Sequence, residues 1–253
     1  MSLSFQLYSA RNFTPWEDVL ATLARIGYTK VEGFGDNFED APAFRSAMDA
    51  NGLSMPTAHF GIDLLEQDLD SVFATAKTLG VSKIVCPYLL PEDRPTDSVG
   101  WKALAERLGA IDATVRQAGF SFAWHNHEFE FTACSDDGSI PMEILLDTVP
   151  SLEWEADIAW VVRGNADPLK WIERYGSRIS VAHAKDIAAE GDCLDEDGWA
   201  DFGHGVMNWK AIYSALRAAG TELFVAEHDN PSDLERFATR ALQSYQNMGA
   251  KGV

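Results

Sequence analysis

Short apolar segments with strand character recur along the whole chain, and each is followed by a longer amphipathic segment. Eight strand candidates stand out, at residues 4–9, 30–35, 54–60, 83–89, 121–127, 152–158, 179–186 and 223–229. The segments between them, such as WEDVLATLARIG and DLDSVFATAKTLG, carry apolar residues at helical spacing and end in glycine, as helices often do. A TIM barrel contains eight strands, each followed by a helix, and the chain shows the same number of strand candidates.

The chain has 253 residues, an ordinary length for one α/β barrel, and no linker or change in composition divides it. We therefore predict an α/β fold with a single (β/α)8 TIM-barrel domain over residues 1–253. A doubly wound open sheet is the alternative. Such a sheet normally carries a glycine-rich phosphate loop after its first strand, and SARNFTPWED at residues 9–18 is no such loop.

The charge of the chain narrows the classes of partner. The chain contains 20 lysine and arginine residues and 39 aspartate and glutamate residues, which gives a formal net charge of −19. Because an anionic surface repels phosphate backbones and acidic lipids, we expect neither a nucleic acid nor a membrane as partner. The sequence contains no run of 18 apolar residues and no recognisable leader, so a cytoplasmic location is expected. A homo-oligomer is left open, because no contact surface can be identified.

Ionisable side chains gather where the predicted strands end. Active sites of TIM barrels lie at the carboxyl ends of the strands. Five of the six histidines fall at such positions. The full set of polar residues at the predicted strand ends is Glu32, His59, His125, Asn126, His127, Asp157, His183, Lys185, Asp186, Glu227, His228 and Asp229. Imidazoles and carboxylates that converge from neighbouring strands predict a divalent-metal site. The alternative is a hydrogen-bonded polar network that closes the top of the barrel.

The segment WHNHEFEF at residues 124–131 ends the fifth predicted strand. Because side chains alternate along a strand, His125 and His127 should share a face while Asn126 points away. The same alternation pairs His183 with Lys185, and Glu227 with Asp229. One member of each pair can then reach a metal on the barrel axis, while the other meets the substrate.

The chain resembles the xylose isomerase-like TIM-barrel superfamily, which contains sugar phosphate isomerases and epimerases, inosose dehydratases and apurinic endonucleases. The similarity extends over nearly the whole chain and is strongest in HNHEFEF, EADIAWVVRGNADPLKWIERYGSRISVAHAKD, GHGVMNWKAI and VAEHDNP. The resemblance implies a divalent metal held by a glutamate ending strand five, an aspartate on strand six, the histidine of an H-x-K-D motif and a glutamate ending strand eight. The last three fall on Asp157, His183 and Glu227.

Strand five departs from the family pattern. Many isomerases and epimerases have Glu-Asn-His where this chain has His125, Asn126 and His127, so His125 becomes the fourth predicted metal ligand. In the epimerases the missing glutamate is also one of two opposed acid/base carboxylates, and a symmetrical two-carboxylate mechanism is therefore not expected. Glu128 or Glu130 could supply a replacement carboxylate. Inosose dehydratases are more similar here, because they carry a histidine run.

The resemblance and the residues together predict a divalent-metal-dependent isomerase or epimerase that acts on a keto-sugar or keto-polyol through an enediolate. Manganese is the expected ion, with Co, Zn, Fe or Mg as alternatives. Glu227 and His127 are the predicted bases, and Lys185 or His127 the acid. Two other functions stay open: a metal-dependent dehydratase of the inosose dehydratase type, and a sugar-binding barrel without catalysis.

Six side chains are predicted to contact the carbohydrate: Glu32, His59, Trp124, Trp160, Arg163 and Asp229. Arg163 could bind a phosphate or carboxylate, and whether the substrate is phosphorylated is left open. Lys185 has an alternative role in an ion pair with Asp186. The acidic stretch DCLDEDGWAD at residues 192–201 is predicted to be a solvated loop.

Overall fold

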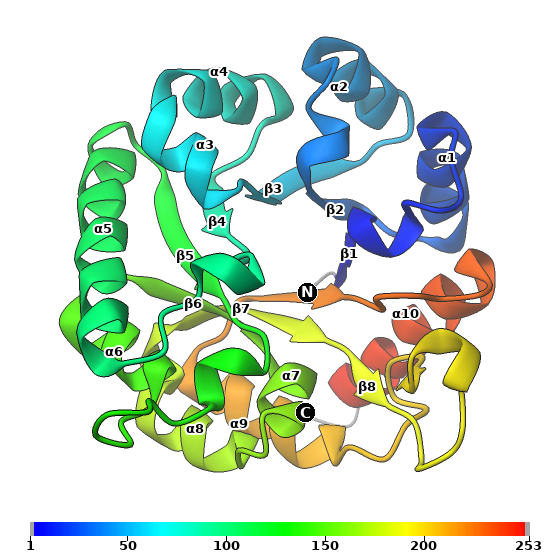
Figure 1. Cartoon of the computed structure of the whole chain (residues 1–253). Helices are drawn as coiled ribbons and strands as arrows, with labels where there is room; N and C mark the ends of the chain where they lie inside the picture. Colours follow the sequence, from blue (N-terminus) through cyan, green and yellow to red (C-terminus); the bar gives the residue numbers. More distant parts are fainter. Residues whose placement is uncertain (1–2, 251–253) are drawn as a thin grey trace.

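The computed structural model describes residues 3–250, which form a closed barrel of parallel strands surrounded by helices (Figure 1). The order of the strands around the barrel is β1-β10-β7-β6-β5-β4-β3-β2. They comprise β1 (Leu3–Gln6), β2 (Lys30–Gly33), β3 (Ser54–His59), β4 (Lys83–Cys86), β5 (Ser121–His125), β6 (Glu153–Asp157), β7 (Ile179–Ala184) and β10 (Leu223–Ala226). The prediction of a TIM barrel is confirmed.

The helices cover the outside of the barrel. They are α1 (Trp16–Ile26), α2 (Ala41–Ala50), α3 (Ile62–Gln67), α4 (Leu69–Leu79), α5 (Ser98–Gln117), α6 (Pro141–Thr148), α7 (Ile158–Arg163), α8 (Pro168–Tyr175), α9 (Trp209–Ala219) and α10 (Leu234–Ala250). Gly27, Gly80 and Gly220 end α1, α4 and α9 in the left-handed conformation, as the glycine pattern predicted. Within residues 3–250, no helix is long and apolar enough to span a bilayer.

Every barrel strand is shorter than the segment predicted for it. β5 ends at His125 and β10 at Ala226, so that His127, Glu227 and Asp229 lie in the loops that follow. Loops after the strands are the usual carriers of TIM-barrel chemistry, because the barrel holds their first residues rigidly. The early ends of the strands thus position these side chains at the mouth of the barrel.

The acidic segment after β7 is only partly the solvated loop that its sequence predicted. Its end forms the short strand β9 (Trp199–Ala200), which pairs antiparallel with β8 (Asp186–Ile187) directly after β7. Two of its carboxylates, Glu196 and Asp201, are buried and bind the guanidinium of Arg236 on α10 at 2.6 and 3.0 Å. These ion pairs hold the loop against helix α10.

Replacing Arg236 by glutamine should therefore lower the free energy of unfolding by about 1–3 kcal/mol, because the two buried carboxylates lose charged donors. Urea denaturation measures the change. Arg25→Gln is the matched control, because Arg25 pairs with Glu235 at the exposed surface, where water and salt screen the ion pair. Equal losses in the two variants would contradict this role of the ion pairs.

Candidate active site

A cavity of about 620 Å³ opens at the carboxyl ends of the barrel strands. Its lining includes six residues that the sequence predicted for the site: His59, His125, His127, Trp160, Glu227 and Asp229. Ligand sites are typically clefts of ~300–1,000 Å³ with few polar groups at fixed positions. Because the cavity lies at the end of the barrel where such chemistry is found, it is the candidate active site.

The four predicted metal ligands converge beside this cavity, and two of them, His125 and Glu227, line it. His125, Asp157, His183 and Glu227 each offer a ligand atom, and these atoms lie within 4.8 Å of one another. All four side chains are buried. They come from β5, β6, β7 and the end of β10, which are neighbours in the barrel, so the backbone alone brings them together.

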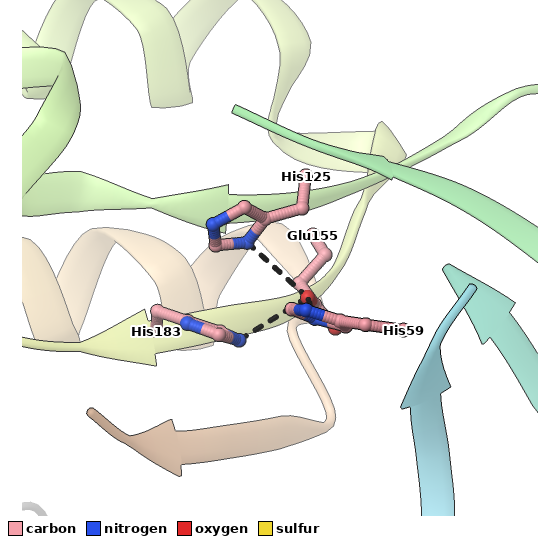
Figure 2. Close-up of side chains that lie close together, drawn as sticks. All are labelled: His59, His125, Glu155 and His183. Carbon is pink, nitrogen blue, oxygen red and sulfur yellow. Dashed lines mark hydrogen bonds and ion pairs between the residues drawn. The ribbon is translucent and has the colours of Figure 1, made fainter. Parts of the chain in front are cut away.

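A second cluster overlaps the first and contains a residue that the sequence analysis missed. Figure 2 shows His59, His125 and His183 gathered around Glu155 of β6. The Glu155 carboxylate lies 2.6 Å from Nε2 of His59 and 3.1 Å from Nε2 of His183. Glu155 stands two residues before Asp157 and therefore shares its face of the strand. That alternation, read in LEWEADI, is the signal that could have found it.

His183 belongs to both clusters, and each of its ring nitrogens lies beside a carboxylate. Nδ1 lies 2.8 Å from Oε2 of Glu227, and Nε2 lies 2.7 Å from Oε1 of Glu32. Burial lowers the pKa of His183, but the carboxylates of Glu227, Glu155 and Glu32 outweigh it and raise this pKa well above its usual value. Histidines that bind metals usually donate their second nitrogen to a carboxylate in this way.

Lys185 is a fully buried cation beside the same group. Its ammonium lies 2.7 Å from Asp229 and 3.4 Å from both Asp157 and Glu227. Burial lowers the pKa of Lys185, but these three carboxylates raise it above its usual value. Lys185 therefore stays protonated at neutral pH.

The alternative ion pair between Lys185 and Asp186 is wrong. The Asp186 carboxylate instead accepts hydrogen bonds from the backbone N–H groups of Ile187, Gly203, Gly205 and Met207. A Cβ on Gly205 would clash with Asp186 and with the Ile187 carbonyl. The glycines of the GHG sequence thus allow the loop after β9 to fold tightly over Asp186.

The turn that carries His127 is fixed by a buried carboxyl group. Glu130 accepts hydrogen bonds from the His127 backbone N–H at 2.9 Å and from the Trp124 indole at 3.0 Å. Burial raises the pKa of Glu130 to about 8, although both donors lower it. The His127 pKa is lowered well below its usual value by burial and by the neighbouring His125 and Lys185. His127 is therefore a neutral imidazole at the cavity surface.

Comparison with known proteins agrees with this architecture. Residues 20–248 match the family model described as xylose isomerase-like TIM barrel. The chain belongs to the xylose isomerase-like TIM-barrel family. The chain is similar to an inosose dehydratase from Geobacillus kaustophilus, with 25% identical residues over 194 positions. These positions make up 68% of this chain and 62% of the length of that relative. The match thus spans less than two thirds of the relative.

Solved structures share the fold of this xylose isomerase-like protein. A sugar phosphate isomerase/epimerase from Parabacteroides distasonis superposes with a TM-score of 0.79 at 21% identity, over 96% of this chain and 93% of that one. The IOLI protein with a binding zinc atom gives 0.81 at 15% identity, over 100% and 99%. A relative from Mycobacterium smegmatis in complex with magnesium gives 0.71 at 15% identity, over 98% and 97%. At these identities the likeness shows the fold.

Three of the residues predicted to bind substrate do not reach the cavity of this xylose isomerase-like barrel. Glu32 is fully buried below His183, where it also accepts hydrogen bonds from Gln6 and Thr57. Trp124 is fully buried because it lies one residue before His125 and so points to the opposite face of β5. Arg163 stacks on Trp199 and donates to the Asp197 carbonyl at 2.8 Å.

The donor set fits a divalent ion. Oδ2 of Asp157 and Oε2 of Glu155 are buried and have no hydrogen-bond partner among the described residues. Burial raises the pKa of Asp157 to about 7, so a nearby cation would favour its charged form. Mixed imidazole and carboxylate ligands suit Mn, Fe, Co and Zn, and the carboxylates also suit Mg.

The raised pKa of Glu130 predicts a pH dependence of stability. Because the folded-state pKa of about 8 lies above the usual value of 4.5, the contribution of Glu130 to stability is complete below about pH 4.5 and is lost as pH rises through 8. Relative to wild type, Glu130→Gln should gain about 1–3 kcal/mol of unfolding free energy between pH 5.5 and 8.5. Urea denaturation across this range measures it, with exposed Glu222→Gln as control. A constant difference between Glu130→Gln and wild type would contradict the prediction.

Proposed function

We propose that this protein is a divalent-metal-dependent enzyme that removes a proton from the carbon beside the carbonyl of a keto-sugar or keto-polyol. The observation that carries the proposal is the convergence of His125, Asp157, His183 and Glu227 beside a cavity that His125 and Glu227 line. The protonated side chain of Lys185 and the neutral imidazole of His127 lie beside them.

His125, Asp157, His183 and Glu227 would hold the ion, and the hydrogen bond from His183 to Glu32 would fix the ring. A divalent ion bound there supplies a Lewis acid for a carbonyl or hydroxyl oxygen of the substrate. Manganese is our first expectation for its identity, and the zinc and magnesium in the related structures support the general class of ion. The Asn126 side chain fixes the end of β6, because its amide oxygen accepts a hydrogen bond from the Asp157 backbone N–H at 3.0 Å and its amide nitrogen donates to the Asp157 carbonyl at 3.1 Å.

His127 is the proposed base. Its imidazole lines the cavity, and its low pKa leaves it able to accept a proton at neutral pH. The bond from its backbone N–H to Glu130 fixes its position. Lys185 does not act as the acid that the sequence suggested, because three carboxylates retain its proton. Its permanent charge instead balances the carboxylates of Asp157, Glu227 and Asp229 beside the cavity.

Isomerisation or epimerisation remains our first reaction class. In an isomerase, one imidazole can take the carbon-bound proton and return it to the neighbouring carbon, while the hydroxyl proton of that carbon passes to the former carbonyl oxygen. A dehydratase additionally needs an acid for the departing hydroxyl, and Lys185 holds its proton too firmly for that role. The dehydratase is the second candidate, supported by the histidine pattern of strand five and by the inosose dehydratase relative.

The proposal predicts that the substrate takes up deuterium from D2O at the carbon beside the carbonyl, and that this uptake depends on the metal. NMR measures the uptake. The panel contains an inosose, ketohexoses, ketones of hexosides and their phosphates, each with and without chelation. His127→Gln should lower the exchange rate by about 10²–10⁴-fold while metal content stays at the wild-type level. His204→Gln is the matched control, because His204 is exposed in a loop. Unchanged exchange in His127→Gln would remove this residue from the mechanism, and no exchange with any ketone would contradict the function.

A further inference from the structure

The walls of the cavity differ in chemistry. The proposed metal ligands and the lining carboxylates come from β5, β6, β7 and β10 or the loops that follow them, whereas the loops after β1 to β4 supply a mainly hydrophobic surface. We call this surface the apolar wall, and it consists of Tyr8, Phe34, Phe38, Phe60, Leu64 and Tyr88. A sugar ring bound at the ligand cluster would therefore face an apolar surface across the cavity.

The rings of the apolar wall pack against one another, and part of this surface is exposed. The rings of Phe38 and Phe60 stack with centroids 4.6 Å apart, and Tyr8 meets Phe34 edge to face at 5.4 Å. Tyr8 and Leu64 are nevertheless each 39% exposed. Contiguous exposed apolar surface is uncommon in soluble proteins and usually marks a binding site. Because this surface continues into the cavity that contains the ligand cluster, the same substrate should contact both.

The size of the cavity also exceeds what one sugar ring requires. Its volume of about 620 Å³ lies in the middle of the ~300–1,000 Å³ range of sites that enclose drug-sized ligands. A single hexose contains only six carbons and six oxygens. The remaining space adjoins the apolar wall, where a second, apolar ring would be removed from water.

The lining offers no free cationic side chain for a phosphate among its described residues. Three carboxylates line the cavity, those of Glu128, Glu227 and Asp229, and Arg94 is the single lysine or arginine among the described lining residues. The Arg94 guanidinium is already engaged, because it donates to the Leu89 carbonyl and the Tyr88 hydroxyl. It also lies over the Phe129 ring at 3.8 Å. A phosphate would therefore find no free lysine or arginine among the described lining residues.

We propose that the substrate is an unphosphorylated glycoside, a keto-sugar whose anomeric carbon carries an aromatic or similar apolar ring that packs on the apolar wall. This inference rests on the proposed function. Because the anomeric carbon of a glycoside is an acetal, the carbonyl that acidifies the neighbouring proton must lie at another carbon of the sugar ring. Metal-dependent exchange beside that carbonyl is then the measured reaction.

The test compares matched ketones: phenyl glucosides oxidised at C2, C3 or C4, the corresponding methyl glucosides, and the 6-phosphates of both. We expect the phenyl compound to exceed the methyl compound in kcat/KM for deuterium exchange by about 10–100-fold, the gain for burying one aromatic ring. The 6-phosphates should be slower than their parents. Leu64→Ala and Phe34→Ala should each reduce the phenyl-to-methyl ratio at least threefold. Leu90→Ala should keep it, because Leu90 is 52% exposed and lies outside the cavity lining.

A binding measurement separates this inference from the proposed function. Calorimetry with unoxidised phenyl and methyl glucosides requires no turnover, and the phenyl compound should bind at least tenfold more tightly. Equal rates and equal affinities for phenyl and methyl compounds, or faster exchange with the 6-phosphates, would overturn the substrate class even where exchange occurs. Preferential phenyl binding that Leu64→Ala abolishes, without exchange in any ketone, would support the aryl site and contradict the enzyme. Thermal unfolding of each variant establishes that it is folded.

Discussion

Glu227→Gln is expected to lower kcat by about 10³-fold or more and to weaken metal binding at least tenfold, because the amide carries no charge. The carboxylate of Glu227 lies 2.8 Å from His183 and 3.4 Å from Lys185, so its loss also leaves these two buried cations with one fewer counter-charge. Steady-state kinetics and metal titration measure the two effects. Glu222→Gln makes the same chemical change at an exposed position just before β10 and should alter neither.

The same variant tests the alternative of a barrel that binds sugars without catalysis. In that case wild type shows no turnover of any ketone, and Glu227→Gln retains most of its affinity for ligand. An enzyme loses turnover on substitution while its fold persists, which thermal unfolding monitors. Wild-type activity in Glu227→Gln would contradict the role of this carboxylate.

Lys185→Met is expected to lower the free energy of unfolding of the metal-free protein by about 3–5 kcal/mol. Methionine has a similar length but no charge, so the carboxylates of Asp157, Glu227 and Asp229 remain buried without the ammonium between them. Urea denaturation in the presence of chelator measures the loss. Exposed Lys102→Met is the control and should change stability by less than about 0.5 kcal/mol.

Metal binding adds a second readout to the Lys185 variant. Because the ammonium lies 3.4 Å from two of the proposed ligand residues, its removal should strengthen the binding of Mn, measured by calorimetry, and added Mn should restore much of the lost stability. Weaker Mn binding in Lys185→Met than in wild type would show that Lys185 supports the ion rather than competing with it.

The barrel could be predicted because it depends on local patterns. Helical spacing, terminal glycines and short apolar segments are set by neighbouring residues, and the eight repeats identify the closed architecture. The convergence of the four proposed ligand residues could be predicted for the same reason. His125, Asp157, His183 and Glu227 all stand where a strand ends, and strand ends converge in a barrel.

The errors arose where the environment depends on distant parts of the chain. Arg163 was assigned to the substrate, but the hairpin of β8 and β9 brings Trp199 and the Asp197 carbonyl to it. Glu32 lies too deep in the barrel to reach the cavity, and its depth depends on the register between β2 and its neighbours. Trp124 and Glu155 were different, since strict alternation along β5 and β6 would have excluded the first and included the second.

The metal content of protein purified without chelator tests the central claim most directly. Elemental analysis should find about one Mn, Co, Fe or Zn per chain, as expected for a single site with four protein ligands. His183→Ala should lose this metal, whereas His204→Ala, at an exposed loop position, should retain it. Absence of bound metal, together with no rise in unfolding temperature on addition of Mn or Zn, would contradict the account and leave the buried histidines as a structural network.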